Sequence, residues 1–540
     1  MNEPLRLDYV SPLPPVRSGI SDYSSDLLPH LEPLCDLRVL RLDDQPVADE
    51  IVERWSPQPA HTVGVGERLP LYQMGNNRYH SHVRRLALGT PGVLTLHDLV
   101  LHHLLLEETL AEQDFEGYEA ALAEEYDWLG ERVAAPRRRG GFGNAAHFAL
   151  PMHCGLLRRQ RGVLVHSEWA AAEVRAAYPE LRVRSIAMGI PLPAAASPRE
   201  GRRFRQRHAL PLDAPLLGSF GFQTPIKRTD VAIAALAQPQ LSDVHLLVVG
   251  EGTPIYDLDK IAHEAGVADR VHVLGFLDYD EFEAAISACD LCLNLRYPTA
   301  GETSASLLRV LAVGCPAVVS DYAQFAELPD EVAVRVPLGD GEIEVLAGSL
   351  AELLAAPDRL AAMGPAARRY VGRRHDPGAA ARQVVDACLE LEGLDPPAGP
   401  RRAISPPTTL LHTRPRGTIE VAGGERPWKL GEARRLDVEV VNTGDCSWLP
   451  TIAGTGGLFL KVQWHGIEDE AAGRWDERKS ETPVELSWFK VQREVRPGQR
   501  LEVSVDVRRP LGGEILIVEP YLKSVAGFYD LGGPIWVREL

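Results

Sequence analysis

The chain has 540 residues, more than one hydrophobic core usually serves, so we expect about three domains. It carries 57 Lys and Arg against 75 Asp and Glu, and the resulting net charge of −18 opposes general adhesion to nucleic acid or anionic lipid. No stretch approaches the roughly 20 uninterrupted apolar residues of a membrane span, so we expect no transmembrane segment.

The first residues, MNEPLRLDYVSP, contain no apolar run before a small-residue cleavage site. We therefore expect no secretory signal and a cytoplasmic protein. The seven cysteines are odd in number and scattered, which favours reduced thiols over a disulfide framework. Cys289 and Cys292 form a CxxC without a second ligand pair nearby, so two buried small residues are a better interpretation than a zinc or redox site.

Residues 1–195 alternate short apolar segments with helical ones. The apolar segments include LRLDYV, LRVLRL, LPLYQM, GVLTLHD and GVLVHS, and SDYSSDLLPHL is one of the helical segments. This alternation predicts an α/β domain with a parallel sheet covered on both faces.

Residues 196–394 repeat the alternation with PLLGSFG, HLLVVG, VHVLGF, LCLNLR and PAVVSD. Two doubly wound, Rossmann-like domains in tandem place a crevice beyond the carboxyl ends of their strands. Residues 345–394 have helical spacing and close the second domain, although their last helices could also cross back to the first.

The last part of the chain changes character. Residues 395–407 are rich in proline and predict a linker. Residues 408–540 alternate apolar and polar side chains with period two, as in RRLDVEVVN and RLEVSVDVRR, between Gly, Asn and Pro turns. This pattern predicts an antiparallel all-β sandwich domain.

The segment RYPTAGETSASLLRVLAVGCPAVVSD, residues 296–321, is the most informative candidate for a binding site. A strand ends at its start, and Thr303 or Ser304 can cap a helix whose first amides have no partner in the helix. Such amides, with the positive end of the helix, favour a diphosphate. Glu302 can accept hydrogen bonds from sugar hydroxyls, and the alternative is that it complements the helix dipole.

Three further strand ends carry candidate residues. Lys227 and Arg228 follow GSFGFQTPI and could neutralise a pyrophosphate, or they could be solvated cations at a helix start. Gly19 begins a helix after the first strand, so its backbone can approach a ligand closely. His97 and Asp98 end the strand LTLHD, where α/β proteins often place functional groups, although such a pair is as often structural.

One basic run, Arg137-Arg138-Arg139, precedes GGFGNAAHFALPM. A solvated loop is its ordinary interpretation, and contact with an acceptor phosphate or a membrane surface is the alternative.

Taken together, these segments resemble glycosyltransferase family 4 (group 1) with its GT-B fold of two facing Rossmann-like domains, over residues 5–390. In the first half the likeness rests on SGISDYSSDLL, GVLTLHDLVLHH and GVLVHSEWA. In the second half it rests on GSFGFQTPIKRTD, VVGEG, VHVLGF and the segment 296–321. The tail, with VVNTGDCSWLP, resembles immunoglobulin-like sandwiches found on bacterial polysaccharide enzymes.

The resemblance implies a retaining transfer from a nucleotide-diphosphate sugar, with no cofactor and no required metal, to a glycan or lipid-linked glycan acceptor. It implies no nucleic-acid partner and allows peripheral membrane contact. By position, Lys227 would contact the donor phosphates, Glu302 the donor sugar, and His97 would lie beside the reacting carbon. The remaining donor-binding positions would be Gly19, Arg228, Thr303, Ser304 and Ser306 at the phosphates and Phe276 beside the base.

Two departures from the family pattern stand out. Arg309 occupies the position of the second glutamate of the Glu-x7-Glu element, and Glu302 is offset by one residue. Gln223-Thr224 stands where an arginine commonly precedes the lysine. A carbohydrate-binding scaffold that has lost turnover is therefore the competing hypothesis, and a sugar phosphorylase on the same fold is a third.

Overall fold

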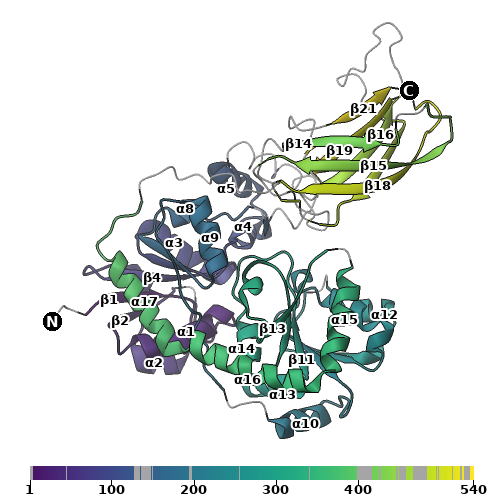
Figure 1. Ribbon diagram of the computed structural model, residues 1–540. Coiled ribbons are helices and arrows are strands. Elements are labelled where there is room, and N and C mark those ends of the chain that lie inside the picture. The colour runs from purple at the N-terminus through teal and green to yellow at the C-terminus, as the bar shows by residue number, and fades with distance from the viewer. Residues whose placement is uncertain are drawn as a thin grey trace. The chain divides into compact units, whose positions relative to one another are not determined.

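The computed structural model describes residues 4–43, 45–126, 130, 134, 147–148, 150–193, 197–253, 256–339, 341–397, 416–424, 427–444, 448, 458–465, 483–493, 495–496, 498–513, 515–522, 526–527 and 535–539. The chain divides into two compact units (Figure 1). Residues 1–108 and 153–401 form the first unit, and residues 109–152 and 402–540 form the second.

The first α/β domain is built on a seven-stranded parallel sheet. Its strand order is β3-β2-β1-β4-β5-β6-β7, with β1 Arg6–Val10, β2 Asp36–Arg41, β3 Gln58–Pro59, β4 Leu69–Met74, β5 Val93–Leu96, β6 Gly162–Val165 and β7 Val183–Ser185. The helices with eight or more residues around it are α1 Gly19–Leu31, α3 Ser81–Gly89 and α9 Glu168–Ala177, and the shorter ones are α2 Asp49–Trp55, α4 His102–Glu108 and α8 Cys154–Leu157. The order reverses between β1 and β4, which is where α/β sheets open a crevice.

The second α/β domain has a six-stranded parallel sheet of the same winding. Its order is β10-β9-β8-β11-β12-β13, with β8 Leu216–Phe220, β9 His245–Val249, β10 Val271–Gly275, β11 Leu291–Asn294, β12 Ala317–Ser320 and β13 Ala333–Val336. The helices are α10 Pro198–Arg207, α11 Thr229–Leu236, α12 Leu258–Glu264, α13 Tyr279–Ala288, α14 Ala305–Val313, α15 Glu342–Leu354, α16 Pro357–Arg374 and α17 Pro377–Leu391. The order reverses between β8 and β11.

The two α/β domains share one hydrophobic core. Leu28 of α1, Leu308 of α14 and Val384 of α17 belong to the same cluster of buried side chains. Helix α17 lies along α1 (Figure 1). Its Gln383 accepts a hydrogen bond from the Ala187 amide at 2.8 Å. The chain therefore returns to the first domain after completing the second.

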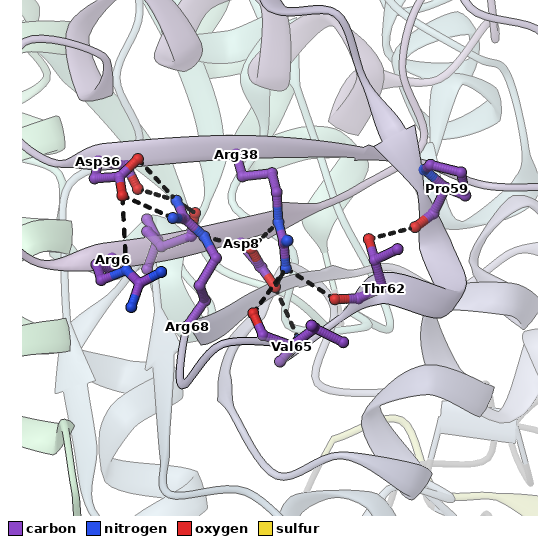
Figure 2. A network of polar contacts seen from close by, with 10 residues as sticks. Arg6, Asp8, Asp36, Arg38, Pro59, Thr62, Val65 and Arg68 are labelled. Carbon is purple, nitrogen blue, oxygen red and sulfur yellow. Dashed lines mark hydrogen bonds and ion pairs between the residues drawn. The ribbon is translucent and has the colours of Figure 1, made fainter.

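A buried ion-pair network stiffens the first sheet (Figure 2). Asp8 in the middle of β1 is fully buried and accepts hydrogen bonds from Arg38 Nε at 2.7 Å and from Arg68 Nε at 2.9 Å. The Gly64 amide donates to the same carboxylate at 2.8 Å. Arg68 also pairs with Asp36 at 2.7 Å. Because a buried charge is tolerated only when it is paired and hydrogen-bonded, this network is structural.

The second unit holds α5 Phe115–Tyr126 and two antiparallel sheets. One contains β14 Gly417–Ala422, β15 Ala433–Asn442 and β18 Arg500–Arg508, and the other contains β17 Glu485–Lys490, β16 Leu458–His465, β19 Ile515–Leu522, β20 Ala526–Gly527 and β21 Trp536–Glu539. Leu436 and Val438 of the first sheet and Trp464 of the second belong to one buried cluster. The two sheets therefore enclose a common core, as the period-two pattern predicts.

These elements confirm the predicted fold class, with two Rossmann-like α/β domains followed by an all-β part. No described helix is long and apolar enough to cross a membrane.

Candidate functional site

The candidate site is built on loops at the carboxyl end of the second sheet. The loop after β8 carries Lys227, and the loop after β11 carries Glu302. Since β8 and β11 are the neighbouring strands at which the winding reverses, both loops open at the switch point of the sheet. The fold thus brings together two segments that lie 75 residues apart.

The Lys227 side chain is buried rather than solvated. It ends a short turn of 3₁₀ helix, Pro225–Lys227, and its side chain amine donates to the carbonyl of Phe220. Burial holds the pKa of Lys227 well below its ordinary value, the nearby charge of Arg296 lowers it further, and Glu302 partly offsets both. A bound anion would stabilise the protonated form of this buried amine, because the anion would replace the water that the amine loses on burial.

Because Gly221 has no side chain, it provides the room that the Lys227 amine occupies. Its φ is +95°, and a Cβ placed on it would lie 2.7 Å from Lys227 Nζ and 3.4 Å from Ser306 Oγ. The lysine amine and the first turn of α14 therefore approach the same point from two sides.

We expect Gly221→Ala to lower the free energy of unfolding by about 1–3 kcal/mol, because alanine strains this backbone and its Cβ displaces the Lys227 amine. Denaturant unfolding measures the change. Gly19→Ala is the matched control, since a Cβ there meets nothing within 4 Å, and it should stay within about 0.5 kcal/mol of the parent protein. Equal stability of the two variants would show that Gly221 is not constrained.

The first turn of α14 supplies amides to the same place. Ser304 is the N-cap residue, and its hydroxyl accepts from the Leu307 amide at 3.3 Å. Ser306 Oγ lies 3.1 Å from Ser304 Oγ. The amides of Ala305 and Ser306 have no acceptor within the helix, so they can receive an anion at its positive end. Thr303, just before the cap, is half-buried.

Glu302 is held by its own loop. Its Oε1 accepts from Arg296 Nε at 3.1 Å, and its Oε2 accepts from Thr299 Oγ1 and from the Ala300 amide, both at 3.0 Å. These three donors fix the position of the carboxyl group. Each carboxylate oxygen has more than one lone pair, so the fixed group can still accept from a ligand hydroxyl.

The loop after β5 of the first domain packs directly on the Glu302 loop. The Val100 amide donates to the Ala300 carbonyl at 3.1 Å. At Gly301, where φ is +81°, a Cβ would lie 2.4 Å from Leu99 Cγ. The strand end that carries His97 and Asp98 therefore faces the segment that carries Glu302 across the seam between the two α/β domains.

His97 is buried within a chain of hydrogen bonds. Its Nδ1 lies 3.3 Å from His166 Nε2, and its Nε2 lies 2.9 Å from the side-chain oxygen Oε1 of Gln73. His166 Nδ1 faces the Ile186 carbonyl at 3.4 Å. Burial lowers the pKa of both histidines, so both rings are neutral at physiological pH. Because Gln73 Oε1 can only accept, the neutral His97 ring carries its proton on Nε2 and accepts at Nδ1 from His166 Nε2.

The other predicted residues lie around this centre. Gly19 opens α1, and its neighbour Ser18 caps that helix. Phe276 follows the edge strand β10 and is 59% exposed, with the Arg17 guanidinium 5.2 Å from its ring centre. Since β10 lies two strands from β8, the carboxyl ends of these two strands are about 10 Å apart.

Two basic residues are engaged by partners that the sequence does not reveal. Arg228 forms a buried ion pair with Glu342, 114 residues along the chain. Arg309 pairs with Asp26 of α1 at 3.0 Å and donates to Tyr279 Oη at 2.7 Å. Arg309 thus joins the two α/β domains at the position where the family pattern has its second glutamate.

The structure therefore gathers Lys227, Glu302, Ser304 and Ser306 at one place and sets the strand end of His97 against it. Sequence reasoning missed Arg296 and His166. His166 directly follows β6, as His97 follows β5, and Arg296 lies two residues after β11, so this position at a carboxyl end was the available signal.

The remaining sequence predictions concern thiols and the basic run. Six described cysteines are free, with Cys292 Sγ 3.3 Å from Cys315 Sγ. Within the described ranges, no three His, Cys, Asp or Glu side chains lie close enough together to hold a metal ion. Arg137-Arg138-Arg139, most of the proline-rich linker and Cys446 lie outside the described residues.

The two Rossmann-like domains, joined where the loop after β5 packs on the Glu302 loop, define the GT-B class of fold. Residues 201–370 match the family model of group 1 glycosyl transferases. This range spans the Lys227 loop, the Glu302 loop and α14, so the matched segment contains the centre of the candidate site.

Two curated relatives illustrate the likeness in sequence. The 2-deoxystreptamine glucosyltransferase of Streptomyces kanamyceticus is 28% identical over 223 residues, which cover 40% of this chain and 57% of that protein. A GDP-mannose-dependent α-(1-6)-phosphatidylinositol monomannoside mannosyltransferase of Mycobacterium tuberculosis is 28% identical over 181 residues, covering 32% and 47%. The chain thus matches about half the length of these relatives.

Two solved structures share the fold. Sucrose-phosphate synthase from Thermosynechococcus elongatus superposes with a TM-score of 0.51 at 17% identity, covering 72% of this chain and 99% of that one. Anabaena HepE in complex with UDP and glucose superposes with a TM-score of 0.50 at 15% identity, covering 72% and 100%. These likenesses support the GT-B arrangement of the two α/β domains.

Proposed function

We propose that this chain is a retaining, metal-independent glycosyltransferase of family 4. It would transfer a sugar from a nucleotide-diphosphate sugar to a hydroxyl of a glycan or lipid-linked glycan, in bacterial polysaccharide or glycoconjugate biosynthesis in the cytoplasm. The observation that carries the proposal is the approach of the Lys227 amine and the Ser306 side chain, in the first turn of α14, to the same point beside Gly221.

In this proposal the donor diphosphate lies on α14, and Lys227 neutralises the charge that develops as the sugar–phosphate bond breaks. Glu302, held by Arg296, orients the donor sugar through its hydroxyls. The acceptor hydroxyl attacks from the face that the phosphate leaves, and the departing phosphate takes its proton. The nearby packing of the His97 loop would exclude water, whose attack would waste the donor.

The test is a panel of nucleotide-diphosphate sugars, with UDP- and GDP-linked sugars first. Binding is followed by thermal shift, and hydrolysis or transfer by mass spectrometry. We expect one donor to bind and turn over, and Glu302→Gln to reduce kcat/KM by at least about tenfold through loss of a charge-assisted hydrogen bond.

Gly19→Ala adds a control for donor approach. Its Cβ meets no protein atom within 4 Å, so any loss of donor affinity without loss of stability would place the ligand against α1. If no nucleotide sugar binds, or if binding is unchanged in Lys227→Ala and Glu302→Ala, the transferase proposal fails. Binding without turnover would favour the scaffold, and activity with inorganic phosphate in place of a nucleotide would favour a phosphorylase.

The C-terminal β unit would serve as an immunoglobulin-like accessory domain. This proposal rests on the Asn-Thr-Gly turn at residues 442–444 and on the shared core of the two sheets around Trp448 and Trp464.

A further inference from the structure

Arg309 makes a contact between the two α/β domains that the proposed mechanism does not use. It lies in the second turn of α14, and its guanidinium donates to Asp26 Oδ2 of α1 at 3.0 Å and to Tyr279 Oη of α13 at 2.7 Å. The guanidinium carbon also lies 5.0 Å from the centre of the Tyr279 ring. Three helices, one from the first domain and two from the second, therefore meet at this side chain.

The ion pair between Asp26 and Arg309 is partly shielded from water. The two side chains are 21% and 16% exposed. Burial raises the pKa of Asp26, and the charge of Arg309 is the largest effect that offsets this rise. Since screening by salt is weaker for a partly buried pair than for an exposed one, removal of either partner leaves the other with a charge that water cannot fully compensate.

The guanidinium is already committed to protein partners. Nη1 donates to the Tyr279 hydroxyl and Nη2 donates to Asp26. Stacking on the Tyr279 ring holds the planar group on the side of the second domain and leaves its fork directed at α1. An arginine that bound a ligand directly would offer these donors to the ligand, so the contacts favour a role between the helices.

The ion pair also lies close to the two helix ends that the proposed function assigns to the donor. Helix α1 begins at Gly19, and α14 begins at Ala305 after its cap Ser304. Because a helix rises about 1.5 Å per residue, Asp26 lies about 10 Å along α1 and Arg309 about 6 Å along α14 from these starting points. A bond between the two side chains therefore restricts how far the two N-termini can move relative to one another.

We propose that Arg309 is a positioning residue for the transfer reaction, because its ion pair with Asp26 fixes α14 relative to α1 and so sets the distance between the donor-binding helix end and the first domain. The position at which the family pattern has its second glutamate thus serves the joint between the domains. The effect on turnover rests on the proposed transferase function, whereas the ion pair itself does not.

A double-mutant cycle on stability tests the ion pair without any substrate. We expect Asp26→Asn and Arg309→Met each to lower the Tm by about 2 °C. The loss in the double variant should be smaller than the sum of the two single losses, because the second substitution removes a group that has already lost its partner. Arg309→Lys keeps the charge and should retain a higher Tm than Arg309→Met. Additive losses would overturn the proposal.

An exposed ion pair gives the matched control. Arg184 of β7 pairs with Glu390 of α17, and their side chains are 57% and 54% exposed. Arg184→Met and Glu390→Gln should each change the Tm by less than about 1 °C and leave kcat unchanged. Coupling in this pair as large as that between Asp26 and Arg309 would show that the interdomain pair has no special strength, and would also overturn the proposal.

Kinetics and nucleotide binding separate positioning from direct contact with the ligand. We expect Asp26→Asn and Arg309→Met each to lower kcat by about tenfold or more, because both release the same joint. The double variant should lose no more than the worse single variant, and Arg309→Lys should stay within about threefold of the parent protein. The Kd for UDP or GDP, whichever the parent protein binds, should stay within about threefold in all four, because the proposed nucleotide contacts lie in the second domain.

Two results would contradict the positioning role. One is weaker nucleotide binding in Arg309→Met with unchanged binding in Asp26→Asn, which would show that Arg309 contacts the ligand itself. The other is an unchanged kcat in both single variants. If the parent protein turns over no nucleotide sugar, the transferase proposal fails together with the positioning role, and the Tm cycle still shows whether the ion pair joins the two domains.

Discussion

Replacing Lys227 by methionine should reduce kcat by about 10²–10³-fold, the loss expected when one preorganised donor to a developing negative charge is removed. Methionine keeps an unbranched apolar stem of similar length, so the packing around Phe220 and Gly221 is retained. Steady-state or single-turnover kinetics with the donor found in the nucleotide-sugar panel measures the effect.

The same substitution should raise the free energy of unfolding at pH 7. Burial holds the pKa of Lys227 well below its ordinary value, so the folded chain binds this proton less tightly than the unfolded chain. The buried lysine therefore lowers the free energy of unfolding of the parent protein at neutral pH. This destabilisation becomes smaller as the pH rises towards the ordinary pKa of lysine. The stability gain of Lys227→Met should shrink in parallel.

Lys260→Met is the matched control. The Lys260 side chain is 69% exposed and lies 3.9 Å from Glu264, so we expect neither kcat nor stability to change by more than a small amount. Loss of both activity and stability in Lys227→Met would indicate that the lysine holds the loop rather than a ligand.

Asp8→Ala should destabilise the first α/β domain by about 3–5 kcal/mol, because it removes the fully buried carboxylate between Arg38 and Arg68, leaving Arg38 without this partner and Arg68 with Asp36 alone. The Gly64 amide loses its acceptor as well. Hydrogen exchange of the amides in β1 and β2 under increasing denaturant measures the loss where it occurs.

An exposed ion pair gives the comparison for Asp8. Glu32 pairs with Arg54 at 2.7 Å, with side chains 42% and 47% exposed, and Glu32→Ala should cost no more than about 1 kcal/mol. Similar losses of unfolding free energy in the two variants would mean that burial does not increase the contribution of the Asp8 ion pairs to stability.

Much of the architecture follows from patterns that are local in the chain. Buried parallel strands need continuous apolar runs, and LTLHD and GVLVHS each contain one that ends in a histidine. Ser304 followed by an apolar helical segment is sufficient to predict where α14 begins, because a serine side chain can cap only nearby amides. Such signals depend on residues three or four positions apart, so the sequence contains them completely.

The environment of each charged side chain depends on partners far away in the chain. Lys227 and Arg228 are adjacent, yet one faces Gly221 and Ser306 while the other pairs with Glu342. Arg228 sits at φ +52°, which turns the backbone between the two side chains. Nothing in the dipeptide itself indicates which cation serves the site.

From its sequence alone, this protein could be assigned its two Rossmann-like domains, its all-β tail and the strand ends that carry polar residues, because periodicity and helix caps are local properties. Only the tertiary structure placed the Asp98 and Glu302 loops in contact and gave Arg309 its partner Asp26, 283 residues away. Those contacts depend on how the domains pack, since burial and neighbouring charge are set by residues from both domains at once.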